Sequence, residues 1–227
     1  MNFETLIIST LETISMTLIS TILAYIVGVP LGVILSITSK KGIKENKWVN
    51  IPLGFFINIM RSIPCLLLII ILLPLTRSVF LKGTGAWYTM IIPLFFASFG
   101  FVSRIVEESL NEVDGGVIEA ARSMGASTMQ IIKKVLFKEA KPSLITGLAV
   151  STISILGYTA FAYDFGAGGL ISTAYSFYAN HTGNYMSYPN VWIVILLIVI
   201  IVQIIQETAI LISKKVDKRR KAKWKTR

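Results

Sequence analysis

Long apolar segments without charge constrain this chain more than any other feature of its sequence. Residues 13–39 contain no Asp, Glu, Lys or Arg, and similar segments follow. Of the 227 residues, 54% are hydrophobic and 15% are charged, whereas a soluble domain carries about 25% charged residues. About 20 consecutive apolar residues can cross a bilayer as a helix. The sequence therefore predicts an all-α, polytopic transmembrane helical bundle. It excludes a disulfide-stabilised secreted scaffold, because Cys65 is the single cysteine.

The apolar segments predict about five spans in a single domain that covers residues 1–227. A long glycine- and tyrosine-rich connection, from about Asp164 to Asn190, separates the last two spans. The five predicted spans are residues 13–39, a part of 49–76, 83–103, 142–163 and 191 to about 212.

Arg61 leaves the limits of the second span open. Either this span begins near Ile51 with Arg61 inside the bilayer, or residues 48–60 lie along the cytoplasmic interface and a short span begins at Ser62. A charge in hydrocarbon is costly, so Arg61 should face protein, water or headgroups. It is expected either as a structural anchor at a helix start or as a side chain that lines a pathway.

Basic residues set the predicted orientation. With the N-terminus outside, the inner segments hold nineteen Lys and Arg: four in the first loop, six in residues 104–141 and nine in the tail 214–227. The outer segments hold two, Arg77 and Lys82. Because basic loops remain in the cytoplasm, the sequence predicts a multi-pass cell-membrane protein with a cytoplasmic C-terminus. The tail is expected to attract anionic membrane lipid, and no nucleic-acid partner is expected.

The sequence offers few groups for catalysis. His181 is the single histidine and is expected as a polar residue of an outer loop, and no span contains a pair of carboxylates. There is no G-x-x-x-x-G-K-[ST] phosphate loop and no metal-ligand spacing. We therefore expect no enzymatic activity, no catalytic residue and no metal site, so that active transport would need energy from a partner.

The charged stretch between the third and fourth spans, about 106–141, predicts two short helices. Asp114 can cap a helix over Val117–Met124, and Gly125 can end it with a left-handed conformation. Ser127 then begins a capping box, S-x-x-Q, for a second helix through about residue 140. A solvated linker needs less structure than this. The two helices are expected to present apolar surface at Met124, Met129, Ile131, Ile132 and Val135.

The same stretch resembles a known family. Glu119-Ala120-Ala121, followed after three residues by Gly125, resembles the EAA signature of the permeases of ATP-binding-cassette importers. The family pattern continues with Ile-x-Leu-Pro, where this chain has Val135-Leu136-Phe137-Lys138. Because Lys138 replaces the proline, the second helix should continue unbroken there.

Other segments resemble the methionine-importer permeases in particular, and the resemblance covers nearly the whole chain. They are residues 58–64 (N-I-M-R-S-I-P), residues 113–126, Gly157-Tyr158 and residues 166–170 (G-A-G-G-L). The resemblance implies the fold of a type I importer permease. It also implies a homodimer around a central pathway, two separate ATPase subunits that carry ATP and Mg²⁺, and an extracytoplasmic substrate-binding protein, with no cofactor in this chain.

The resemblance also implies roles for individual residues. The first helix of the loop would be the coupling helix, which rests in a cleft of the ATPase. The coupling residues would be Glu119, Ala120, Ala121, Met124, Gly125 and Ala126. Candidates for the pathway or its gate are Arg61, Ser62, Pro64, Ser154, Tyr158, Gly166, Gly168 and Gly169. For the last three, a plain helix stop is the alternative.

Two further interpretations stay open at this point. Gly28 and Gly32 form a G-x-x-x-G pattern that suits close helix packing, either within one subunit or at a dimer seam. The leading function is the permease of a methionine importer (L, D or both), or of an importer for another small amino acid. The alternatives are a secondary transporter or channel that works alone, which would need buried carboxylates for ion coupling, and a membrane scaffold that does not transport.

Overall fold

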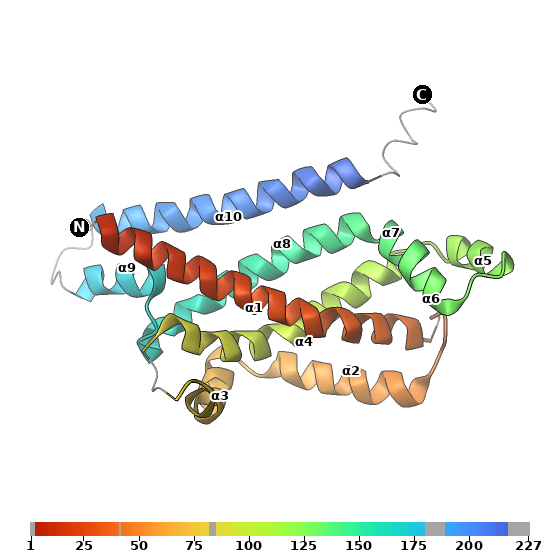
Figure 1. Ribbon diagram of the computed structural model, residues 1–227, viewed down its shortest axis with the longest axis horizontal. Helices are drawn as coiled ribbons and strands as arrows, with labels where there is room; N and C mark the ends of the chain where they lie inside the picture. The colour runs from red at the N-terminus through yellow and green to blue at the C-terminus, as the bar shows by residue number, and fades with distance from the viewer. Residues whose placement is uncertain (1–2, 41, 82–84, 180–188, 218–227) are drawn as a thin grey trace. The chain divides into compact units, whose positions relative to one another are not determined.

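The chain is helical almost throughout the residues that the structure describes. The computed structural model describes residues 3–40, 42–81, 85–179 and 189–217 (Figure 1), and no residue in these ranges lies in a β-strand. In chain order the helices are α1 (Phe3–Thr38), α2 (Lys47–Ser62), α3 (Cys65–Phe80), η1 (Trp87–Met90), α4 (Ile91–Asn111), α5 (Gly115–Ser123), α6 (Thr128–Gln130), η2 (Ile131–Leu136), α7 (Phe137–Glu139), α8 (Lys141–Tyr158), η3 (Thr159–Phe165), α9 (Gly169–Ala179) and α10 (Pro189–Val216).

Several helices are long and apolar enough to cross a membrane. In the described residues four segments qualify alone: Phe3–Thr38, Trp87–Asn111, Lys141–Phe165 and Asn190–Val216. α2 and α3 qualify only as a pair with a bend at the break between them. With this pair counted as one span, the described chain has the predicted five spans, and the all-α polytopic membrane class is confirmed.

The contacts of the chain divide it into two units, and the four long helices contribute residues to both. The first unit consists of Met1–Ala24, Arg61–Ser98 and Ser151–Ile205, and the second of Tyr25–Met60, Phe99–Val150 and Gln206–Arg227. The two units are described separately below. That residues 1–227 act as one permease domain stays a prediction.

The second predicted span is two helices, because Pro64 interrupts it. Proline has no N–H and disfavours a helical conformation in the residue before it, and α2 accordingly ends before Ile63. If the second span begins near Ile51, it is therefore a broken span, and the position of Arg61 inside or outside the bilayer stays a prediction. Arg61 lies in the last turn of α2 and not at a helix start, while its role as an anchor or in the pathway stays a prediction. The placement of residues 48–60 along the cytoplasmic interface stays a prediction.

In the first unit, α9 corrects the prediction of a plain connection over residues 164–190. Gly169 donates its backbone N–H to the Glu12 carboxylate at 2.8 Å, and Leu170 donates to Thr13 Oγ1 at 2.8 Å. Side chains of α1 thus satisfy two backbone donors that the start of a helix leaves free. Ser9 and Thr173 add a hydroxyl pair at 2.6 Å. His181 falls outside the described residues.

In the second unit, glycines bring α1 against α4 of the same chain. A Cβ built at Gly28 would lie 2.6 Å from Val102 Cγ1, and one at Gly32 would lie 2.5 Å from the Ser103 carbonyl oxygen. Neither position has room for a side chain. The G-x-x-x-G pattern therefore serves packing within one subunit, and Pro30 lies inside α1 without interrupting it.

Gly32→Ala tests this packing. Its methyl group would overlap the Ser103 backbone, so we expect the free energy of unfolding to fall by about 1–3 kcal/mol. For a chain of this size that lowers Tm by roughly 2–12 °C. Thermal unfolding of the detergent-purified protein measures the shift. Gly157→Ala is the matched control, because a Cβ at Gly157 meets no atom within 4 Å. Equal Tm values for Gly32→Ala and the wild type would contradict the packing role.

Candidate functional site: the loop between α4 and α8

The first helix of the loop forms as its sequence predicts. Asp114 accepts the backbone N–H of Gly116 at 2.7 Å and begins α5. α5 ends at Ser123, and Gly125 follows with φ of 79°. A non-glycine residue in this left-handed conformation costs about 1–2 kcal/mol. The predicted cap and the predicted glycine turn are both confirmed.

The second helix of the loop consists of three consecutive elements, α6, η2 and α7. Ser127 accepts the N–H of Gln130 at 3.4 Å, and Gln130 Oε1 accepts the N–H of Ser127 at 2.8 Å, which completes the predicted capping box. α6, η2 and α7 then form one helical run, of which Ile131–Leu136 is π-helical. The run continues through Lys138, as predicted from the missing proline.

The loop exposes a smaller apolar surface than predicted. Met124 is 82% exposed and Met129 is 57% exposed. Ile131 and Ile132 are buried, at 1% and 7% exposure, and Val135 is half-buried. The prediction that Ile131 and Ile132 face outward is wrong, because the π-helical segment directs them into the unit, where α5 packs against it.

The predicted coupling residues divide by their exposure. Glu119 and Ala120 are exposed, as Met124 and Gly125 are, whereas Ala126 is half-buried. Ala121 is only 6% exposed, and its carbonyl oxygen accepts the N–H of Ala126 at 3.1 Å. Ala121 therefore packs the loop internally, and the exposed residues are the ones that can meet a partner.

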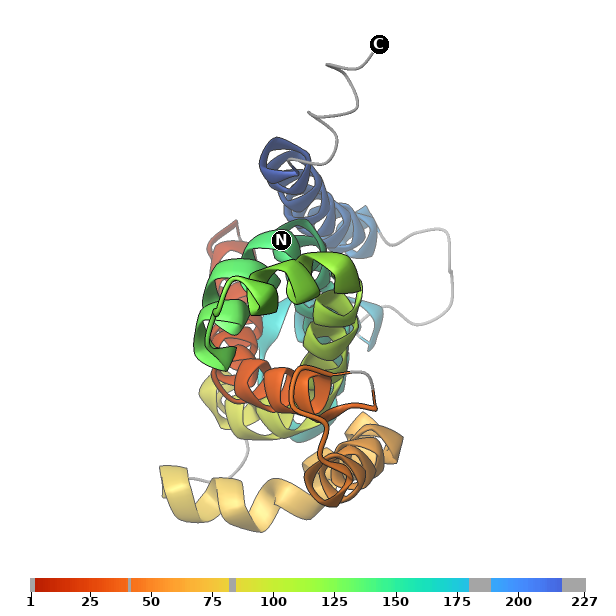
Figure 2. The ribbon, with the colours of Figure 1, turned by 90° about the vertical axis from the view of Figure 1, so that its right-hand side faces the viewer.

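Contacts with the end of α1 hold α5 in place. Figure 2 shows the side of the molecule on which α5 and the helical run after it lie. Arg122 donates to the carbonyl oxygen of Ile43 at 2.7 Å, in the segment that follows α1. A cavity of about 480 Å³ lies beside this contact, and both Glu119 and Arg122 line it. α5 is therefore attached to the chain on one side and open on the other.

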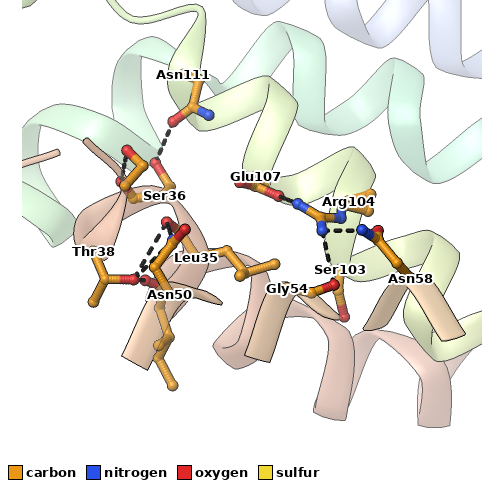
Figure 3. Close-up of polar contacts among 12 residues, drawn as sticks. Leu35, Ser36, Thr38, Asn50, Gly54, Asn58, Ser103, Arg104, Glu107 and Asn111 are labelled. Atoms are coloured by element: carbon orange, nitrogen blue, oxygen red, sulfur yellow. Dashed lines mark hydrogen bonds and ion pairs between the residues drawn. The ribbon is translucent and has the colours of Figure 1, made fainter. Parts of the chain in front are cut away.

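Arg104 of α4, which the sequence does not single out, joins α4 to α2 through hydrogen bonds of its half-buried side chain. Arg104 pairs with Glu107 at 2.6 Å, with side chains only 19% and 14% exposed. The guanidinium also donates to the Gly54 carbonyl oxygen at 3.1 Å and to Asn58 Oδ1 at 2.8 Å (Figure 3). Among the described residues, Arg104 Nε has no hydrogen-bond partner. The i, i+3 spacing of Arg104 and Glu107 was the available sequence signal.

Two more side chains complete this polar network in the second unit. Asn50 of α2 donates to the Leu35 carbonyl oxygen at 2.8 Å and to Thr38 Oγ1 at 3.1 Å. Ser36 of α1 donates to Asn111 Oδ1 at 2.7 Å, at the last residue of α4 (Figure 3). We call these contacts, with those of Arg104, the α1–α2–α4 network. It links the three helices close to the point where α5 begins.

The predicted pathway residues all belong to the first unit. Arg61, Ser62 and Pro64 are exposed at the break between α2 and α3. Tyr158 of α8 is half-buried and packs with Cys65 against the core of this unit. It lies close enough to Arg61 and Cys65 to interact electrostatically with both. The structure therefore brings the break and Tyr158 together.

The remaining pathway candidates are less exposed or have a structural role. Ser154 is half-buried on α8. Gly166 (φ 69°) ends η3, and Gly168 (φ 65°) and Gly169 (φ 90°) lead into α9. A Cβ at Gly168 would lie 2.5 Å from Glu12 Oε2. These glycines therefore shape the turn and its contact with α1. In the described part of the chain no three His, Cys, Asp or Glu side chains could hold a metal ion together.

The sequence and structure match known transport proteins. The family model described as "Binding-protein-dependent transport system inner membrane component" matches residues 28–210. The chain is 39% identical over 213 residues to the probable D-methionine transport system permease protein MetI of Haemophilus influenzae, covering 93% of this chain and 97% of the relative. It is 46% identical over 188 residues to the methionine import system permease protein MetP of Bacillus subtilis, covering 82% of each chain.

A solved structure agrees with these relatives. A chain of the MetNI methionine ABC transporter in an inward-facing conformation superposes with a TM-score of 0.88 at 33% identity, covering 95% of this chain and 98% of that chain. The resemblance found in the EAA loop and the neighbouring segments is thereby confirmed. Since the family model covers most of the sequence, the chain belongs to the family of inner membrane components of binding-protein-dependent transport systems.

Proposed function

We propose that this chain is the membrane-spanning permease subunit of an ATP-driven methionine importer. The observation that carries the proposal is the likeness to the MetNI methionine ABC transporter over 95% of the chain, together with the methionine permeases among its relatives. Two copies of the chain would enclose the pathway, and two separate ATPase subunits would bind ATP and Mg²⁺. A substrate-binding protein would deliver methionine from outside.

In this proposal the exposed side of α5 is the surface that meets the ATPase. Met124, at 82% exposure, supplies an apolar contact for a groove in the partner. Glu119 is exposed nearby and can form a charge-assisted hydrogen bond with a cationic side chain. Ala120 allows close approach, because its side chain is a single methyl group.

The α1–α2–α4 network would carry the movement of α5 into the spans. Asn111 and α5 are separated by three residues, and Arg122 binds the segment that follows α1. Coupling through a protein needs contiguous packed or hydrogen-bonded elements, and the contacts of Arg104, Asn50 and Ser36 supply them within this unit. The pathway itself is proposed at Arg61, Ser62, Pro64, Ser154 and Tyr158, with the turn at Gly166, Gly168 and Gly169 as a gate element.

Reconstitution tests the proposed activity. Proteoliposomes that contain the chain with its co-purified ATPase should take up labelled L- or D-methionine only when ATP and the loaded binding protein are both supplied. Vesicles with the chain alone should show no uptake, because the sequence carries no ATP-binding loop. Uptake by the chain alone would instead favour a secondary transporter or channel. Uptake of another small amino acid in place of methionine would move the proposal to a different substrate.

Thiol labelling tests the proposed orientation, with the N-terminus outside and the C-terminus in the cytoplasm. In a Cys65→Ser background, Ser176→Cys on α9 should react with an impermeant thiol reagent in intact cells. Lys133→Cys on the loop should react only after the membrane is permeabilised. Both side chains are exposed, so access depends on the side of the membrane. Labelling of Lys133→Cys in intact cells would contradict this orientation.

Gly125→Val tests the coupling role of the loop. Valine has room at this position, since no atom lies within 4 Å of a built Cβ, but it must adopt φ of 79°. The cost is about 1–2 kcal/mol or more for a β-branched side chain, and it is relieved by turning α5. We expect normal insertion, at least tenfold slower methionine uptake, and ATP hydrolysis that no longer responds to the loaded binding protein.

Gly115→Val is the matched control for this variant. Gly115 lies at the other end of α5, has no neighbour within 4 Å of a built Cβ, and does not have a positive φ. Uptake by this control should stay within about twofold of the wild type. If Gly125→Val took up methionine at the wild-type rate and its ATP hydrolysis still responded to the loaded binding protein, the glycine turn would have no part in coupling.

A further inference from the structure

Three lysines line a cleft in the second unit that the proposed transport function does not use. The cleft has a volume of about 330 Å³ and lies between the end of the loop's second helix, the start of α8 and the end of α10. Its basic residues are Lys134, Lys138 and Lys141. Lys134 and Lys138 lie in the helical run that ends the loop, and Lys141 begins α8. We call this feature the lysine cleft.

The three ammonium groups have no counter-ion within the described chain. All three side chains are exposed. Among the described residues none forms an ion pair within 4.0 Å or a hydrogen bond with them. Like charges that line one cleft repel one another, so the arrangement does not help the chain to fold. The three lysines outnumber the two carboxylates that also line the cleft, Glu139 and Asp217, and the remaining positive charge attracts an anion.

The other walls of the cleft suit an amphipathic ligand. Pro142 and Val216 give it apolar surface, and the Glu139 and Asp217 carboxylates give it hydrogen-bond acceptors. Ser213 of α10 donates to the Pro142 carbonyl oxygen at 3.1 Å, which holds the end of α10 against the start of α8. The cleft therefore offers an excess of positive charge beside an apolar edge.

The position of the cleft along the spans identifies the ligand. Lys141 is the first residue of one candidate span and Val216 is the last residue of another. A site at the ends of two spans lies where hydrocarbon gives way to lipid headgroups. We propose that the lysine cleft binds one anionic phospholipid. Its phosphate accepts hydrogen bonds from the three lysines, and its acyl chains follow the apolar sides of α8 and α10.

Binding in the cleft is independent of the direction in which the protein is inserted, although its assignment to the inner leaflet rests on the proposed orientation. If thiol labelling showed the opposite orientation, the lipid would be assigned to the outer leaflet. Absence of the lipid would leave the transport function intact. The two proposals therefore fail separately.

Native mass spectrometry of the detergent-purified, full-length protein with its co-purified subunits tests this site. The probes are dioleoyl-phosphatidylglycerol, dioleoyl-phosphatidylethanolamine and dioleoyl-phosphatidylcholine. The wild type should retain phosphatidylglycerol in preference to the other two lipids. The triple variant K134Q/K138Q/K141Q should bind phosphatidylglycerol roughly tenfold or more weakly, since each basic residue near the headgroups contributes to the attraction.

The control variant K40Q/K44Q/K133Q removes the same number of charges from exposed lysines outside the cleft. It should bind phosphatidylglycerol as the wild type does, and both variants keep the basic tail. Equal losses in the two variants, or equal retention of all three lipids, would overturn the site. Displacement by millimolar inorganic phosphate would assign it to a free anion instead. Loss of a co-purified subunit with unchanged lipid binding would assign the lysines to a protein partner.

Discussion

The bilayer core offers no water to backbone N–H and C=O groups, and this constraint accounts for most of the structure. Each span must form its backbone hydrogen bonds internally, so it is a helix. Lipid is as apolar as the side chains of a span, and the hydrophobic effect therefore does not hold the helices together. Close contacts at small residues and polar side chains do so instead: Gly32 meets the backbone of Ser103, and Arg104 binds the carbonyl oxygen of Gly54.

The same constraint explains which parts of the fold could be predicted from the sequence. Spans depend on hydropathy over about 20 residues, a local property, and the five predicted spans correspond to helices or to the α2–α3 pair. α9 could not be found in this way. Its first turn is stabilised by Glu12 and Thr13, 157 positions away in the chain. Pro64 does carry a local signal for the break of the second span, because proline disfavours a helical conformation in the residue before it.

The candidate site shows the same division between local and distant causes. Asp114, Gly125 and the Ser127 capping box act within a few residues, and all three formed as predicted. The burial of Ile131 and Ile132 depends on which way a π-helical segment turns its side chains, and helical spacing alone assigned them wrongly to the surface. The partners of Arg104 come from α2, and a sequence shows only the Glu107 neighbour. The roles of the coupling and pathway residues stay predictions until they are tested.

The free energies of individual contacts indicate how a displacement of α5 could reach the rest of the second unit. Hydrogen bonds to a charged group contribute about 1.5–3 kcal/mol each, so the bonds from Arg104 to the Gly54 carbonyl oxygen and Asn58 Oδ1 resist separation of α2 from α4. At Gly125 a change of backbone conformation carries almost no steric cost, because glycine populates both signs of φ. α5 is nevertheless restrained, since Ala121 is buried and Arg122 holds the Ile43 carbonyl oxygen. A displacement applied at Met124 or Glu119 would therefore move α5 together with the ends of α1 and α4, and the turn at Gly125 would absorb the change in direction.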